Sequence, residues 1–389
     1  MCLEAPMNKI NNFLPNQYDQ DQLYSVKHNY LSEQFSDYKT ILNKIETIIL
    51  NNDFTLGREV DEFEKNITSI VGTKHCIAVG SGTDAIRLSL IALGVKQGDE
   101  VITTPYTFHA TIGAIVTAGA KPIFVDIEDD FNINTEKISS AITHKTKAIV
   151  PVHWAGRPIE PSKVMEISSE YSIPVVEDAC HAIMAHRGGV KAGAIGTTGC
   201  FSLHPLKNLN AWGDGGFICT DDSAISEKLR LLRNHGLESR DSCSIFGFNS
   251  RLDTIQAVVA NHLISSLPHI TKMRIKNALL LDKKLGGIKQ IKTPARDSEI
   301  HEVFHLYCFQ AEDRDALVSF LNSKGIDAKK HYPIPMHLQK AAKYLGYKKG
   351  DFPVAEKLAN STISLPVHEF IIPEQIEIMA DLVRRFYNG

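Results

Sequence analysis

The stretch HCIAVGSGTDAIRLSLIALG, residues 75–94, predicts a strand, a glycine-rich turn and a helix in direct succession. The apolar run His75–Val79 does not alternate strictly with polar residues, which is typical of a strand buried on both faces. In Thr83–Leu93 the large aliphatic side chains recur on one helical face, and Gly94 then ends the helix. This unit predicts one strand-to-helix step of an α/β fold.

Further short apolar runs follow, with helical patterns between several of them. They lie at Glu100–Thr104, Pro122–Val125, Lys147–Val152, Ile173–Glu177, Gly199–Leu203 and Gly216–Thr220. Strands interleaved with helices favour a parallel sheet. We therefore expect an α/β domain built on a mostly parallel, seven-stranded sheet.

The pattern changes after a long helix expected at Leu252–Leu267. One clear strand, Val303–Gln310, is accompanied by helices at about 271–285, 312–323, 351–360 and 373–387. These elements predict a smaller α+β domain at the C-terminus. The expected organisation is an N-terminal arm (1–40), a large domain (41–268) and a small domain (269–389).

Composition narrows the functional classes. The 389 residues hold 42 Lys plus Arg against 45 Asp plus Glu, a net charge of −3, which favours neither nucleic-acid binding nor a polybasic membrane patch. The seven cysteines are scattered and form no C-x-x-C pair, which fits a reducing compartment. We see no signal peptide and no apolar run long enough to span a membrane, so we expect a cytoplasmic protein.

Two motifs invite more specific interpretations. GSGTDA (80–85) matches the dinucleotide fingerprint G-x-G-x-x-A, but Asp99 and Glu100 fall before the next strand, whereas a ribose-binding acid should follow it. A single phosphate group at the helix N-terminus is the better interpretation. HEVFH (301–305) matches the zinc motif H-E-x-x-H, which requires a helix; its β-prone surroundings favour a structural strand.

The most informative stretch is FSLHPLKNLNAWGDGG (201–216), in which a buried strand leads into a loop with one lysine, Lys207. A solvated lysine is one interpretation; a desolvated lysine, whose pKa is lowered, suits Schiff-base chemistry. A second apolar strand ends in Asp178, where parallel sheets bind ligands. Pyridoxal phosphate needs such a lysine, an acid for its ring nitrogen and a phosphate cup. Lys207, Asp178 and the helix start at Gly82–Thr83 could supply all three.

At this point the residues resemble a known family, the DegT/DnrJ sugar aminotransferases among the fold type I pyridoxal-phosphate enzymes. The resemblance extends from about residue 40 to the C-terminus and rests on the order and spacing of several blocks. These are GSGTDA (80–85), PYTFHAT (105–111), PVHWAGRP (151–158), VVEDACHA (175–182), FSLHPLKNLNAWGDGG (201–216), FGFNSRLDTIQA (246–257) and, more loosely, HYPIPMH (331–337) and SLP (364–366).

The resemblance implies the catalytic roles. Lys207 would form the Schiff base with the cofactor and then act as general base, and Asp178 would keep the pyridine nitrogen protonated. His181 stands where many relatives have glutamine, near the phenolic oxygen of the cofactor.

The resemblance also implies the remaining cofactor contacts. Gly82, Thr83 and Ser202 would bind the phosphate, and Phe108 would stack on the ring. Asn249 would reach the phosphate in the neighbouring subunit, so the active site would require a homodimer.

By the same resemblance, the chain would move an amino group from glutamate to a keto-sugar, for surface polysaccharide or lipopolysaccharide biosynthesis. Most relatives use a nucleotide-linked keto-hexose. The lysine loop also resembles that of aminotransferases making 8-amino-3,8-dideoxy-manno-octulosonate (Kdo8N), whose acceptor is a free 8-keto-octulosonate. His331 and Tyr332 are candidates for the substrate mouth, whereas neither Arg233 nor Arg251 is singled out as the partner of the glutamate carboxylate.

Two alternatives belong to other classes. One is a pyridoxal-phosphate sugar dehydratase on the same fold, whose members replace the lysine by histidine; Lys207 disfavours it. The other is a non-catalytic regulatory protein, which the complete set of Lys207, Asp178 and phosphate cup disfavours.

Overall fold

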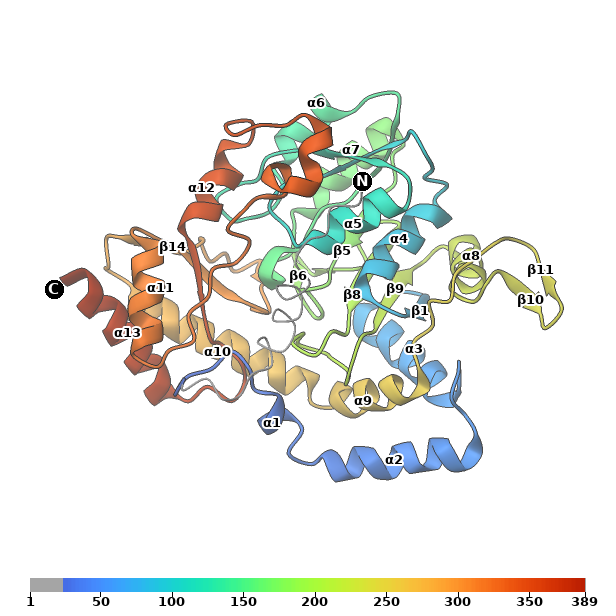
Figure 1. Ribbon diagram of the computed structural model, residues 1–389, viewed down its shortest axis with the longest axis horizontal. Coiled ribbons are helices and arrows are strands. Elements are labelled where there is room, and N and C mark those ends of the chain that lie inside the picture. Colours follow the sequence, from blue (N-terminus) through green and yellow to red (C-terminus); the bar gives the residue numbers. More distant parts are fainter. Residues whose placement is uncertain (1–23, 389) are drawn as a thin grey trace, which may run out of the picture.

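The computed structural model describes residues 24–388 (Figure 1). Most of the expected N-terminal arm, residues 1–23, lies outside the described residues. The part that is described contains α1 (Leu31–Gln34) and leads into α2 (Tyr38–Asn51), which packs on α9 (Thr254–Ile264). Val26 pairs with Ile326 and belongs to the C-terminal core, so this segment connects both ends of the chain.

A sheet of seven strands organises the larger part of the described chain. Its strands are β1 (His75–Val79), β2 (Glu100–Thr103), β3 (Lys121–Phe124), β4 (Thr146–Ile149), β5 (Val176–Asp178), β8 (Thr198–Ser202) and β9 (Gly216–Thr220). They form two hydrogen-bonded groups, in the orders β1-β9-β8-β5 and β3-β2-β4. Two parallel bridges, Ile149 with Val175 and Val152 with Asp178, join the groups into one sheet. All seven expected strands are present, within a few residues of the predicted bounds, and the α/β fold class is confirmed.

One strand runs against the others. β9 pairs antiparallel with both β1 and β8, while β5 is parallel to β8 and β2 is parallel to its two neighbours. An antiparallel pair can be joined without a crossover helix. The segment between β8 and β9 is therefore a loop, and this loop carries Lys207.

Helices cover both faces of this sheet. Side chains alternate along β1, so Cys76 and Ala78 pack with α3 (Arg58–Val71) and α9, whereas Ile77 and Val79 pack on the other side. That second face is covered by α4 (Gly82–Ala92), α5 (His109–Thr117) and α8 (Ser223–Arg233). Burial on both faces explains why the strands show no strict polar alternation.

A second hydrophobic core forms the C-terminal part. Its antiparallel sheet has the order β12 (Ile291–Lys292), β14 (Tyr307–Ala311) and β15 (Thr362–Leu365). The helices of this part are α10 (Leu267–Leu285), α11 (Arg314–Ser323), α12 (Pro353–Ser361) and α13 (Pro373–Asn388). The long α10 runs from the larger part into this one (Figure 1). The boundary at 268/269 stays a prediction.

The strand expected at Val303–Gln310 is shorter than predicted. Phe304 adopts a left-handed conformation (φ 46°), and β14 begins only at Tyr307. The turn brings the carbonyls of Phe304 and His305 to Nη1 of Arg274, at 3.2 and 3.4 Å. The β-prone residues before Tyr307 therefore form a turn that contacts a buried arginine, and not the first part of the strand.

The same turn decides the geometry of the H-E-x-x-H motif. His301 lies in β13 (Ile300–His301) and stacks on His186 of β6 (His186–Arg187), whereas His305 lies in irregular chain. The motif is therefore not on a helix. Of its two histidines, only His301 lies in a strand, as expected for a structural role. Residues 24–388 contain no cluster of three or more His, Cys, Asp or Glu side chains suited to a metal ion.

The remaining elements lie at the periphery. They are α6 (Ile138–Ala141), α7 (Pro161–Tyr171), β7 (Val190–Lys191), and the hairpin β10 (Leu237–Ser239) and β11 (Ser242–Cys243). The hairpin stands out on the side opposite the C-terminal helices (Figure 1). Within the described part of the chain, no helix is both long and apolar enough to cross a membrane.

Candidate active site

A cavity of about 390 Å³ opens where parallel strands of the large sheet end. The residues that follow β1, the last residue of β5 and the last residue of β8 all line it. Carboxyl ends of parallel strands meet at one edge of a sheet, which is where α/β folds bind ligands. The cavity therefore collects Lys207, Asp178, Gly82, Thr83, Phe108, His181 and Ser202, which are all the predicted site residues except Asn249.

Lys207 is held by its backbone. Its N–H donates to the carbonyl of His204 (2.8 Å), and its own carbonyl accepts from Nδ2 of Asn210 (2.9 Å) and from the Tyr30 hydroxyl (3.5 Å). Burial lowers the pKa of Lys207, although electrostatic interactions with Cys180 and Asp178 act in the opposite direction. The loop thus presents an amine that loses its proton more easily than an exposed lysine does.

Asp178 is buried at the end of β5. Its Oδ2 accepts a hydrogen bond from Oγ1 of Thr111 (2.7 Å), and its Oδ1 accepts one from the backbone N–H of Cys180 (3.2 Å). Both donors are neutral, so the negative charge remains available to a protonated ring nitrogen. This is the arrangement expected for an acid that supports a pyridinium.

The start of α4 supplies anion-binding groups. Ser81 caps the helix by accepting from the N–H of Asp84 (3.0 Å), which leaves the N–H groups of Gly82 and Thr83 at the helix N-terminus without carbonyl acceptors. A Cβ on Gly82 would lie 2.7 Å from Cβ of Ser202. Glycine therefore allows the helix end to approach the Ser202 hydroxyl, and the resulting cup suits a phosphate.

Two histidines lie side by side near Lys207. Nδ1 of His181 accepts from the N–H of Ala155 (3.2 Å), and the His181 and His305 ring centroids are 4.4 Å apart. Burial, followed by electrostatic interactions with Lys207 and His331, lowers the pKa of His181 well below its usual range. The neutral ring must then carry its proton on Nε2, so His181 is a hydrogen-bond donor.

The mouth of the cavity is aromatic. Phe108 is 53% exposed, immediately precedes α5 and lies 6.1 Å, centroid to centroid, from the ring of Tyr332. Tyr332 and His331 both line the cavity, as the sequence suggested. A flat ring of a cofactor could pack against Phe108 from the cavity side.

Asn249 does not line the cavity of its own chain. It is exposed and pairs with Asn234 at the end of the segment that holds the β10–β11 hairpin. Arg233 is tied to Glu64 at 2.5 Å, and Arg251 donates to Asn234 at 3.0 Å. Neither arginine lines the cavity, so the structure gives neither a role toward a substrate carboxylate.

Sequence reasoning missed several residues of the site. Thr111, which holds Asp178, belongs to the block PYTFHAT, and its position in the first turn of α5 could have marked it. His305 also lines the cavity, although the sequence points to it only through the zinc motif. The hydroxyl of Thr107 lies 2.8 Å from that of Thr111. Their contacts depend on packing between distant segments.

The residues present fit pyridoxal phosphate. One cavity combines an amine whose pKa burial lowers, a buried carboxylate with neutral donors, and a helix N-terminus that a glycine brings against a serine hydroxyl. These are the three groups that the cofactor requires.

Comparisons with known proteins identify the family of the chain. The model of the DegT/DnrJ/EryC1/StrS aminotransferase family matches residues 36–384. A protein of Geobacillus stearothermophilus named pleiotropic regulatory protein is 40% identical, over 92% of this chain and 97% of its own length. The UDP-N-acetyl-3-dehydro-alpha-D-glucosamine 3-aminotransferase of Acidithiobacillus ferrooxidans is 38% identical, over 90% and 94%. The crystal structure of DesV from Streptomyces venezuelae, in complex with a ketimine intermediate, superimposes with a TM-score of 0.91 at 32% identity, covering 94% of this chain and 99% of DesV.

Proposed function

The chain belongs to the DegT/DnrJ/EryC1/StrS aminotransferase family, and we propose that it transfers an amino group from glutamate to a keto-sugar. It is a sugar aminotransferase, and its cofactor is pyridoxal phosphate. The cofactor supplies an electron-withdrawing ring that carries the amino group between donor and acceptor. The protein must hold that ring, keep its nitrogen protonated and move protons beside it.

Lys207 is the proposed catalytic base. Its lowered pKa increases the fraction of free amine at Nζ, and a positioned amine can take a proton from the substrate carbon and return it at a neighbouring atom. Such positioned proton transfer contributes roughly 10²–10⁴-fold to the rate. The contacts from Asn210 and Tyr30 to the Lys207 carbonyl keep the loop in place while the side chain moves.

The other proposed roles follow from position. Asp178 holds the ring nitrogen protonated, and Nε2 of His181 donates toward the phenolic oxygen. Gly82, Thr83 and Ser202 bind the phosphate, and Phe108 packs on the ring. Each of these side chains or backbone groups lines the same cavity as Lys207.

Asn249 is proposed to act in a homodimer. Because it is exposed and lies outside the cavity of its own chain, it is free to reach the phosphate site of a partner subunit. Phe246, three residues earlier, is 95% exposed, and contact with a partner subunit would bury its ring. Both observations support a shared active site.

The pathway and the location are further proposals. An amino-sugar product fits surface polysaccharide or lipopolysaccharide biosynthesis, with either a nucleotide-linked keto-hexose or an 8-keto-octulosonate as the acceptor. We place the enzyme in the cytoplasm, which the unpaired cysteines among the described residues support.

The single observation that carries the function is that Lys207, Asp178 and the α4 phosphate cup line one cavity. The test is to mix the pyridoxal-phosphate enzyme with glutamate alone. The visible absorbance of the cofactor should give way to that of the pyridoxamine form, and 2-oxoglutarate should appear. An unchanged spectrum would refute the aminotransferase assignment.

Two variants sharpen this test. Lys207→Ala should lower turnover at least ~10²-fold, while Lys289→Ala, on the surface of the C-terminal part, should leave it unchanged. Borohydride reduction followed by peptide mapping should place the cofactor mass on the peptide containing Lys207. A label on any other side chain would overturn the role of this lysine.

A further inference from the structure

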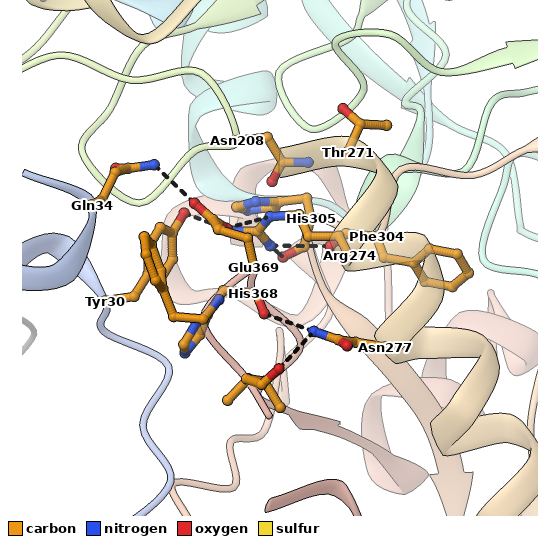
Figure 2. A network of polar contacts seen from close by, with 12 residues as sticks. Tyr30, Gln34, Asn208, Thr271, Arg274, Asn277, Phe304, His305, His368 and Glu369 are labelled. Atoms are coloured by element: carbon orange, nitrogen blue, oxygen red, sulfur yellow. Dashed lines mark hydrogen bonds and ion pairs between the residues drawn. The ribbon is translucent and has the colours of Figure 1, made fainter. Parts of the chain in front are cut away.

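A second cavity, of about 120 Å³, adjoins the cofactor cavity. The two share four lining residues, Leu206, His305, Leu306 and His331. Leu206 directly precedes Lys207, so the second cavity begins beside the reactive amine. Figure 2 shows its wall, where Tyr30, His368 and His305 surround Arg274 of α10.

The lining of this second cavity is rich in nitrogen-bearing side chains. Six of its residues carry nitrogen-rich side chains: His28, Arg274, His305, Lys329, His331 and His368. None of the described residues that line it is Asp or Glu. A pocket with donors and cations but no lining acid is suited to an anion.

Arg274 forms the rigid part of this wall. Its Nη1 donates to the carbonyls of Phe304 and His305, its Nη2 donates to the Tyr30 hydroxyl (2.6 Å), and its Nε lies 3.5 Å from Glu369. The guanidinium is therefore committed to protein groups. It forms a fixed wall of the cavity, with its charge paired to Glu369, and does not offer free donors to a ligand.

The histidines contribute polarity but little charge. Burial lowers the pKa of His331 to about 3 and that of His368 to about 3, so both rings are neutral at pH 7. Two buried imidazole nitrogens, Nε2 of His28 and Nδ1 of His305, have no hydrogen-bond partner among the described residues. Buried polar atoms are normally paired, so this pair indicates room for a polar ligand.

Lys329 has N–H donors that could still bind a ligand. Its Nζ lies 3.4 Å from Oδ2 of Asp327, and its side chain is 42% exposed. An ammonium has three N–H donors, and this single long contact occupies at most one of them. Lys329 and His331 are separated by one residue, and both line the cavity.

We propose that this cavity, the anion subsite, binds the carboxylate of a keto-sugar acid that serves as the amino acceptor, with Lys329 as its counter-ion and His28 and His305 as hydrogen-bond partners. The proposal rests on the aminotransferase function proposed above and narrows its substrate class. Size supports it: sites for whole drug-sized ligands usually occupy about 300–1,000 Å³. A space of about 120 Å³ fits a carboxylate with a few carbon atoms, and a nucleoside diphosphate would have to lie outside it.

Direct binding tests the proposal without catalysis. The probe is 3-deoxy-octulosonate, a sugar acid with a hydroxyl in place of the reacting group, and its control is the methyl ester, which lacks the charge. Calorimetry on the pyridoxamine-phosphate enzyme should show that the acid binds at least ~10-fold more tightly than the ester, as expected for a charge-assisted pair worth at least ~1.4 kcal/mol. Lys329→Gln should remove this difference.

A matched variant separates the subsite from general charge. Lys330→Gln removes the same charge one residue away, where the side chain pairs with Asp315, and it should keep the preference for the acid. Equal loss in both variants, equal binding of acid and ester, or no binding of the acid to the wild-type enzyme would overturn the proposal.

Glutamate also carries carboxylates, so the donor is the other possible source of the anion. The pyridoxal form reacts with glutamate in a half-reaction that changes its spectrum. The glutamate concentration that gives half the maximal rate of this change should be the same in Lys329→Gln and in the wild-type enzyme. A parallel loss there would assign the anion subsite to the donor and overturn the acceptor assignment. A wild-type enzyme that fails to react with glutamate would refute the proposed function itself, whereas a normal glutamate reaction with no acid preference would refute only the subsite.

Discussion

Thr111 Oγ1 donates a 2.7 Å hydrogen bond to Asp178 Oδ2, and this contact connects the first turn of α5 to the end of β5. Thr111 is fully buried, and Thr107 lies 2.8 Å from its hydroxyl. The carboxylate that faces the cofactor site is therefore fixed by a residue that does not itself carry charge.

Replacing this threonine should misplace the acid. We expect Thr111→Val to lower kcat by about 10–100-fold, since hydrogen bonds to charged groups are worth about 1.5–3 kcal/mol. Thr111→Ser keeps the hydroxyl and should retain most activity. A purely structural role would lower the melting temperature without changing the visible spectrum of the bound cofactor, so a shifted cofactor spectrum in the valine variant alone is the deciding measurement.

The exposed position of Asn249 allows a complementation test. Lys207→Ala and Asn249→Ala should each be nearly inactive as pure proteins. When the two are unfolded and refolded together, half of the dimers should be mixed, and one site in each should combine Lys207 from one subunit with Asn249 from the other. Recovery of about a quarter of the wild-type activity is expected from random pairing in a two-fold dimer. No recovery would show that Asn249 does not act across the interface.

Buried histidines should make the fold sensitive to acid. The pKa of His368 is lowered to about 3, mainly by burial and then by the charge of Arg274. Between about pH 6.5 and pH 3, the unfolded chain therefore binds a proton at this histidine, whereas the folded chain does not. The free energy of unfolding must therefore fall as the pH falls through this window. Nε2 of His368 donates to the carbonyl of Lys27 (2.9 Å), and glutamine can retain that donor.

Urea titrations at pH 7 and pH 5 measure this effect. The unfolding free energy of the wild-type protein should fall from pH 7 to pH 5, and this fall should be about 1–2 kcal/mol smaller in His368→Gln. The exposed His144 provides the control, and His144→Gln should leave the loss unchanged. The same pH dependence in all three proteins would contradict the role of His368.

Glu177, the neighbour of Asp178, should be a determinant of stability. Its fully buried carboxylate accepts from the N–H groups of Gly193 (2.7 Å), Ile195 and Gly196 (2.8 Å each), and its Oε2 lies 2.8 Å from Nε2 of His153. In Glu177→Gln an amide NH₂ must face donors. Because a buried unsatisfied donor costs about 1–3 kcal/mol, we expect a loss of unfolding free energy of about this size in urea titrations. Glu166→Gln, on the exposed side of α7, should be neutral.

The sequence was sufficient for the parts of the site that strand order determines. Lys207, Asp178 and the Gly82–Thr83 turn each follow or end an apolar run, and the ends of parallel strands meet at one edge. Convergence of these residues could therefore be predicted before any contact was known. The resemblance to a family added Phe108, His181, Ser202 and Asn249.

The remaining features depend on contacts between distant segments. Nothing in the run Gly216–Thr220 shows that it is antiparallel to its neighbours, because a buried strand has the same composition in either direction. At the left-handed turn of Phe304, the carbonyl accepts from Arg274, thirty residues earlier, and local β-propensity does not reveal this contact. Likewise, Thr111 and Asp178 are 67 residues apart, and no local pattern connects them.

The reversal of direction between β8 and β9 has a practical consequence. Had these strands been parallel, a crossover of a dozen or more residues, usually helical, would have had to pass over a face of the sheet. Instead, residues 203–215 leave and re-enter the sheet at the same edge, between strands whose register is fixed by Ser202 and Gly216. The reactive lysine therefore lies on a short segment whose two ends are fixed by neighbouring, hydrogen-bonded strands, so no helix has to move for this segment to adjust.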